Sequence, residues 1–108
     1  MPALLAVAIA LSGLHGVVTR GPITPVCQVG TPCSEPAVGT VLVFSRNGRD
    51  AARVRTGAGG RYSVRLVAGY YTVRVSPAQK IGGLKPSQVR VRAGVSSRMD
   101  FAVDTGIR

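Results

Sequence analysis

Apolar and polar residues alternate along most of the chain, in short runs that Gly, Pro, Asn and Ser separate. Side chains of a β-strand point to opposite faces with a period of two, and no stretch carries a convincing helical period of 3.6. Strands punctuated by turn residues at this spacing are typical of an all-β sandwich. The seven alternating runs are residues 16–20, 39–45, 52–56, 60–66, 70–76, 88–93 and 97–103. The pattern therefore predicts a seven-stranded β-sandwich.

One run differs from the others because it is apolar at every position. Residues 41–44 read Val-Leu-Val-Phe, which predicts a central strand covered on both faces. Asn47-Gly48 follows it and predicts a tight hairpin turn. Most arginines occupy the positions opposite the apolar ones, so we expect them on the outer faces, where charge discourages edge-to-edge aggregation.

Length and charge narrow the classes of protein. A chain of 108 residues makes one small domain and excludes a multidomain enzyme. With 45% apolar residues the chain is expected to fold. Its 14 Lys and Arg stand against 4 Asp and Glu, a formal net charge of +10, which favours an acidic partner.

The beginning of the chain looks like an export signal. Residues 1–14 contain no charged side chain, and the apolar run 3–11 has the length of a signal-peptide core rather than that of a membrane span of about 20 residues. Small residues at suitable spacing predict a mature start near Leu11 or Gly13. We therefore predict a signal peptide over residues 1–12, no transmembrane anchor, and a secreted or extracytoplasmic protein. An apolar first strand or helix is the alternative.

Two cysteines enclose a loop of five residues. An exported chain favours a structural disulfide between Cys27 and Cys33, which would fix the shape of that loop. Zinc would need two further ligands, and His15 is the single histidine. The spacing does not match a C-x-x-C redox motif. We expect neither a metal nor a cofactor.

A family resemblance appears in the middle of the chain. Thr56 is followed by GRYSVRL at 60–66 and AGYYTVRV at 68–75. This resembles the T-D-x-x-G-x-Y/F…L-x-x-G-x-Y-x-V pattern of carboxypeptidase regulatory-like domains, with Gly57 where that family often has Asp. The resemblance covers about residues 16–103. It includes small exported bacterial members with similar cysteine loops.

The resemblance implies a transthyretin-like, Ig-like Greek-key sandwich over residues 16–108. It places Tyr62, Leu66, Tyr71 and Val73 in the core between the sheets. In true carboxypeptidases this domain accompanies the peptidase and is not itself the catalyst. The fold serves many roles, so it names no function.

Candidate catalytic groups are few. Acidic side chains occur at Glu35, Asp50, Asp100 and Asp104, and the histidine lies close to the predicted processing point at His15. Asp100 and Asp104 would lie about 13 Å apart on a strand, too far for acid–base pairing. We predict that the protein is not an enzyme and has no catalytic residues.

The sequence then favours a non-enzymatic exported module with an interaction or structural role at the bacterial cell surface. Its partner would be a protein or an anionic cell-surface polymer, and the alternative is a carbohydrate-binding module. Nucleic acid is disfavoured, because no binding motif is present and the chain is exported. Arginines of compositional origin, without a binding role, are a further alternative. The candidate contact residues are Tyr70, Arg53, Arg55, Arg61, Arg65, Arg74, Arg90 and Arg92.

Overall fold

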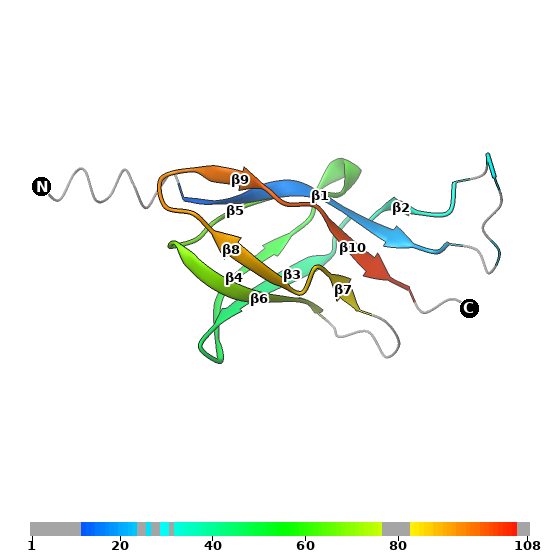
Figure 1. The fold of residues 1–108 in the computed structure, drawn as a ribbon. Helices are drawn as coiled ribbons and strands as arrows, with labels where there is room; N and C mark the ends of the chain where they lie inside the picture. The colour runs from blue at the N-terminus through cyan, green and yellow to red at the C-terminus, as the bar shows by residue number, and fades with distance from the viewer. Residues whose placement is uncertain (1–11, 24–25, 27–28, 31, 77–82, 106–108) are drawn as a thin grey trace, which may run out of the picture.

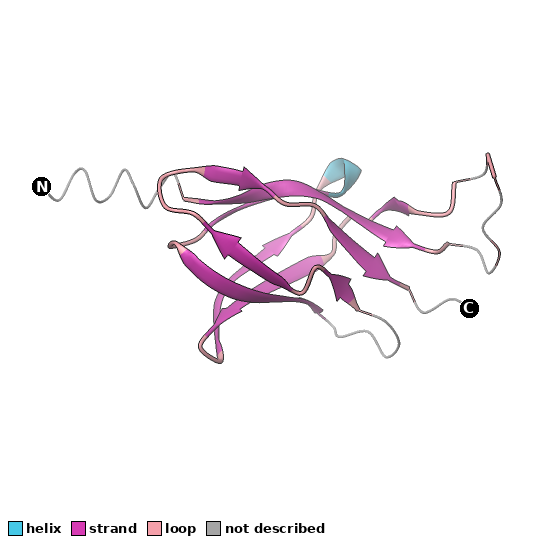
Figure 2. Ribbon diagram, viewed as in Figure 1, coloured by secondary structure: helices cyan, strands magenta, loops and turns pink. Residues whose placement is uncertain are grey.

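The computed structural model describes residues 12–23, 26, 29–30, 32–76 and 83–105 (Figure 1). These residues form β-strands and one short 3-10 turn, η1 (Figure 2). The elements in chain order are β1 (Gly13–Gly21), β2 (Glu35–Pro36), β3 (Val41–Arg46), β4 (Arg49–Arg55), η1 (Ala58–Gly60), β5 (Arg61–Arg65), β6 (Gly69–Ser76), β7 (Leu84–Lys85), β8 (Gln88–Val91), β9 (Ser96–Arg98) and β10 (Phe101–Asp104).

The strands form two sheets that face each other as a sandwich. One sheet has four antiparallel strands in the order β4-β3-β6-β8. The other has six strands and is built on β1, with β9 and β10 pairing in parallel with successive parts of β1. Strands β2 and β5 pair antiparallel with β1, and β7 pairs with β10. The predicted all-β sandwich is confirmed.

Three aromatic rings join the two sheets at the centre of the core. Phe44 comes from β3 of the four-stranded sheet, whereas Tyr62 and Phe101 come from the six-stranded sheet. Their ring centroids lie 5.6 to 6.5 Å apart. The Tyr62 hydroxyl donates a hydrogen bond to the Met99 carbonyl. Burial raises the pKa of Tyr62, so the phenol stays protonated as the donor of this bond.

The predicted central strand is an inner strand of its sheet, with β4 and β6 on its two sides. Leu42 and Phe44 face the core, and Val43 is fully buried although it lies outside the core cluster. The neighbours of Val43 on the adjacent strands are Arg53 and Arg74. Long arginine side chains cover apolar surface with their aliphatic parts, so two arginines supply the second cover of this strand.

The seven predicted runs all fall on strands, but one of them is not a single strand. Residues 97–103 were expected to be continuous, and the structure divides them into β9 and β10 around Asp100. At the break the Asp100 carboxylate accepts a hydrogen bond of 2.9 Å from the Val17 N–H of β1. At this point the N–H of β1 is bound by the Asp100 carboxylate instead of by a backbone carbonyl of a neighbouring strand. The two-residue strands β2 and β7 were not predicted.

The first strand begins at Gly13, three residues before the predicted start at residue 16. Ser12 and Leu14 are buried. The Ser12 hydroxyl accepts a hydrogen bond of 2.9 Å from the Gly94 N–H, and the Ser12 carbonyl accepts one from the Leu66 N–H. Residue 12 is therefore part of the sandwich.

Two predictions concern segments of which the structure describes little. Residues 1–11, the larger part of the predicted signal peptide, lie outside the described residues. So does Cys27, and the predicted Cys27–Cys33 disulfide stays a prediction. In the part of the chain that is described, no helix is long and apolar enough to cross a membrane.

We expect Phe44→Ala to lower the free energy of unfolding by about 3–5 kcal/mol, because it removes the ring that joins the sheets and leaves a cavity. Equilibrium unfolding in urea measures this loss. Val38→Ala is the control, since Val38 is exposed and its truncation should change stability little. A loss for Phe44→Ala as small as that of the control would show that the aromatic cluster does not hold the sheets together.

The break at Asp100 should also give stability a dependence on pH. The Val17 N–H, and after it the Arg98 side chain, lower the pKa of Asp100 below its ordinary value of 3.8. The carboxylate therefore stabilises the folded state above that value, and this contribution is lost as the pH falls through the folded-state pKa. We expect Asp100→Asn to lose less stability than the wild type in thermal melts between about pH 5 and pH 2. Parallel profiles for the two proteins would contradict this role.

Candidate binding surface

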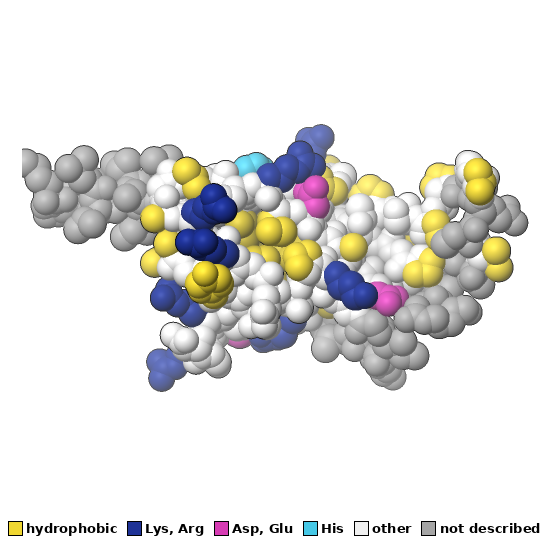
Figure 3. All heavy atoms as spheres, in the orientation of Figure 1, with side chains coloured by type: hydrophobic (Ala, Val, Ile, Leu, Met, Phe, Trp, Pro, Cys, Tyr) yellow, Lys and Arg dark blue, Asp and Glu magenta, His cyan; other side chains and the backbone are white. Residues whose placement is uncertain are grey.

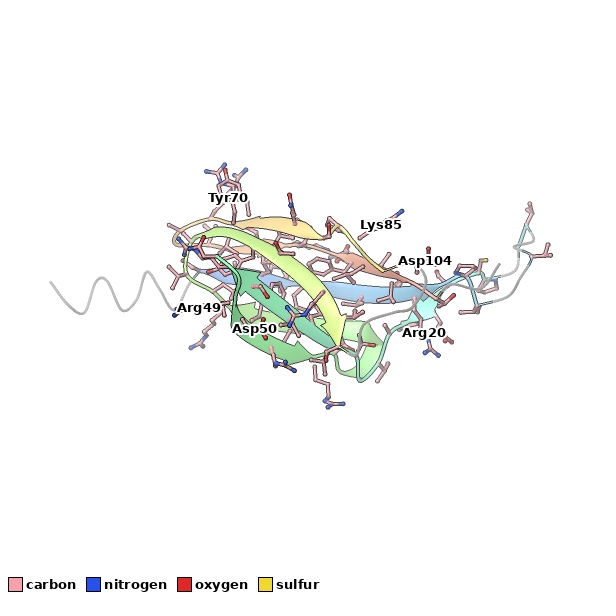
Figure 4. The ribbon with its side chains drawn as sticks, turned by 90° about the horizontal axis from the view of Figure 1, so that it is seen from below. Arg20, Arg49, Asp50, Tyr70, Lys85 and Asp104 are labelled. Carbon is pink, nitrogen blue, oxygen red and sulfur yellow. The ribbon has the colours of Figure 1, made fainter. Side chains whose placement is uncertain are left out.

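Adjacent tyrosines on β6 point to opposite faces of the four-stranded sheet. Tyr71 is 4% exposed and belongs to the core, and its hydroxyl donates to the Val67 carbonyl. Tyr70 is 72% exposed. Figure 4 shows Tyr70 pointing away from the strands and away from Asp50. An exposed aromatic ring held on a strand is a rigid platform for a ligand.

Two arginines lie beside these rings. The guanidinium of Arg90, on β8, lies 5.7 Å from the centroid of the Tyr70 ring. The guanidinium of Arg46, at the end of β3, lies 6.0 Å from the centroid of the Tyr71 ring, and its Nη1 donates to the Ala68 carbonyl at 3.3 Å. Both distances are within the range of cation–π contacts.

Gly69 leaves room for the guanidinium of Arg46. A Cβ built on Gly69 would lie 3.0 Å from Cζ of Arg46, and the φ of Gly69 is +154°, which side chains rarely adopt. The guanidinium therefore packs directly against backbone where a glycine leaves the space. Arg46 was not among the predicted contact residues. The glycine before the two tyrosines is the sequence signal that could have pointed to a close approach there.

A hollow of about 530 Å³ opens between these side chains. Its walls include both tyrosines, Arg46 and Arg90, and its polar lining side chains are Ser45, Asn47, Thr72 and Gln88. A second hollow of about 590 Å³ shares Tyr70 and Arg90 with the first and adds Arg92. None of the described residues that line either hollow is acidic. Tyr70 and Arg90 thus stand between two basic hollows.

The carboxylate of Asp50 forms ion pairs with two arginines of the four-stranded sheet. Asp50 receives hydrogen bonds from both Nη atoms of Arg74, at 3.1 and 3.2 Å, and one from the Ser45 hydroxyl at 2.9 Å. Arg53 lies 3.7 Å from the same carboxylate. The Arg74 hydrogen bonds are the main reason that the pKa of Asp50 lies below its ordinary value. Arg53 and Arg74 therefore share the one carboxylate of Asp50, and both flank Val43.

Several arginines of the sheet take part in no ion pair among the described residues; Arg49 and Arg55 lie on β4, and three others gather where β6 begins and β8 ends. Within the described residues, no ion pair involves Arg46, Arg90 or Arg92. Figure 3 shows Lys and Arg side chains gathered at the end of the molecule where β6 begins and β8 ends, with hydrophobic side chains between them. We call Arg46, Tyr70, Arg90 and Arg92 the Tyr70 end.

The structure does not bring all predicted contact residues into one surface. Tyr70, Arg90 and Arg92 lie together, whereas Arg53 and Arg74 are held by Asp50. Arg55 lies towards the other end of β4, where it donates to the Gly39 carbonyl. The remaining two belong to β5 of the six-stranded sheet; they are Arg61 and Arg65.

A second polar cluster lies on the six-stranded sheet. His15 Nδ1 and Ser96 Oγ are 2.8 Å apart, and both residues are exposed. The nearby Asp100 carboxylate binds the Val17 N–H and the Arg98 guanidinium instead of orienting the histidine. A nucleophile and its base are activated when a third group orients the base, and that contact is missing between these described residues. The described part of the chain also holds no group of three or more side chains placed to bind a metal ion.

Comparison with known proteins identifies the fold. No family model and no curated sequence matches the chain. Among solved structures it is similar to 5-hydroxyisourate hydrolase of Klebsiella pneumoniae, with a TM-score of 0.50 and 19% sequence identity over 89% of this chain and 92% of that one. The chain has a transthyretin-like β-sandwich fold. At this identity the likeness extends to the fold alone.

Proposed function

We propose that the protein is a non-enzymatic, exported binding module that recognises an anionic polymer of the bacterial cell surface through the Tyr70 end. The observation that carries the proposal is that three guanidiniums, for which the described residues show no ion pair, line the two hollows that the exposed Tyr70 ring borders. The single acidic residue within the strands of the four-stranded sheet, Asp50, engages Arg53 and Arg74 instead.

Arginine suits this task for two physical reasons. The planar guanidinium offers parallel N–H donors that match the two oxygens of a carboxylate or phosphate. The net charge of +10 also attracts any polyanion before contact is made. The net charge acts over the whole molecule, whereas the paired N–H donors act where the guanidiniums of the Tyr70 end meet a ligand.

Binding is better supported than hydrolysis. The solved structure to which the chain is similar is that of a hydrolase, but a fold can serve many functions. Among the described residues, no carboxylate is hydrogen-bonded to the histidine of the exposed His15–Ser96 pair. We therefore place the function of this chain in recognition and not in bond cleavage.

The place of action follows from the beginning of the chain and from the family resemblance. The uncharged run 3–11 has the composition of an export signal. We propose that the chain is a small exported member of the carboxypeptidase regulatory-like domains, on the motif at residues 56–75. Outside the cytoplasm, anionic polymers of the envelope are more accessible partners than nucleic acid.

We expect Arg46→Gln/Arg90→Gln to bind polygalacturonate about tenfold more weakly than the wild type, because each ion pair between an exposed guanidinium and a carboxylate contributes up to about 1 kcal/mol. Isothermal titration calorimetry at low salt measures the affinity, which should fall as salt is added. The matched control is Arg55→Gln/Arg61→Gln, which removes the same charge away from the Tyr70 end. Equal losses in the two double variants would mean that only net charge is recognised.

The contacts of Ser12 favour one of the two predicted processing points. Cleavage before Gly13 would remove the Ser12 hydroxyl that binds Gly94 and the carbonyl that binds Leu66. We therefore expect the exported protein to begin at Leu11, as intact mass spectrometry of the envelope and culture fractions will show. A full-length cytosolic protein would refute export, and a protein that begins at Gly13 would refute the role of Ser12.

A further inference from the structure

The chemistry of the hollow between the two tyrosines points to a narrower class of ligand than any polyanion. Resting on the proposed function, we propose that the Tyr70 end binds an acidic saccharide. The pyranose ring packs on Tyr70, and its carboxylate faces Arg46 and Arg90. The argument has three parts, which concern the ring, the charge and the polar lining.

The ring platform is Tyr70. It lies within β6 and is paired with Arg90 of β8 in the ladder, so β8 fixes its backbone on one side; the pairing of β6 with β3 begins at Thr72. Its side chain is 72% exposed and borders both hollows. The face of an aromatic ring is electron-rich, and it attracts the slightly positive C–H groups on the face of a sugar ring. A polyanion without rings has no such C–H face to pack on Tyr70.

The charge is already in place before a ligand arrives. Arg46 is held by the Ala68 carbonyl and the Tyr71 ring, against the backbone of Gly69. A side chain that is already ordered loses little entropy on binding. Arg90 lies against the Tyr70 ring, so that a carboxylate attached to a ring on Tyr70 meets a guanidinium nearby.

The polar lining favours a sugar over other anions. Asn47 and Gln88 carry amides, and Thr72 carries a hydroxyl; these groups donate as well as accept hydrogen bonds. Sugar hydroxyls also do both, whereas carboxylates and phosphates only accept. The volume of about 530 Å³ lies in the usual range of small-molecule sites. A hollow lined by amides, hydroxyls, guanidiniums and one platform ring therefore matches an acidic saccharide.

The test compares four short ligands that differ in one feature each. A galacturonic acid tetramer has rings and carboxylates, a glutamic acid tetramer has carboxylates without sugar rings, and maltotetraose has rings without charge. A four-residue oligothymidylate carries phosphates and bases that also stack on aromatic rings. Their affinities are measured by calorimetry for the wild type, Tyr70→Ala, Tyr70→Phe and the control Arg61→Gln.

We expect the galacturonic acid tetramer to bind about fivefold more tightly than the glutamic acid tetramer, the difference being the ring contact on Tyr70. Tyr70→Ala should abolish this difference, whereas Tyr70→Phe and Arg61→Gln should keep it. Maltotetraose should bind more weakly than the galacturonic acid tetramer, because it gives the guanidiniums no carboxylate. Tyr70 is exposed, so the alanine variant should fold as the wild type does.

Each other outcome overturns a defined part of the account. Equal binding of the galacturonic and glutamic acid tetramers, unaffected by Tyr70→Ala, refutes the saccharide and leaves the anionic binding module intact. Tightest binding of the oligothymidylate refutes the saccharide in favour of nucleic acid. Binding of maltotetraose as tight as that of the acidic tetramer, or no binding of any ligand, refutes both the saccharide and the proposed function.

Discussion

The contact of Phe44 with Tyr62 and Phe101 across the sandwich is the constraint on which the other features depend. This contact turns one face of β3 towards the core. Because β4 and β6 pair with β3, the ladder then determines which of their side chains face the core as well. Because side chains alternate with a period of two, a slip of one residue would exchange every inner and outer position. The placing of Tyr71 inside and Tyr70 outside follows from this packing, and so does the existence of a basic outer surface.

The distribution of acidic residues then shapes that surface. The four-stranded sheet carries a single carboxylate, Asp50, within its strands. Arg53 and Arg74 bind it, and both also flank Val43, so these two arginines serve the structure. Arg46, which follows the Asp50-bound Ser45 on β3, and Arg90 instead rest on tyrosine rings. Arginines that look equivalent in the sequence therefore divide into structural ones and ones available to a ligand.

The sequence predicted the strands well because alternation is a local signal, and it predicted Tyr70 and Arg90 as outer residues for the same reason. Other features depend on contacts between distant segments. The break at Asp100 needs the N–H of Val17, 83 positions away, and Arg46 takes its place only because Gly69 lies opposite it. Alternation also does not say which sheet a strand joins, and for this reason it could not separate Arg61 and Arg65, on β5 of the six-stranded sheet, from the arginines of the four-stranded sheet.

The central claim is that recognition is confined to the Tyr70 end. Side-chain NMR of the arginine Nε–Hε groups, recorded while the galacturonic acid tetramer is added, tests it at the level of single residues. We expect the signals of Arg46 and Arg90 to shift together and to saturate, while those of Arg53, Arg74 and Arg61 stay in place. Shifts spread over all arginines, or confined to those outside the Tyr70 end, would contradict the account.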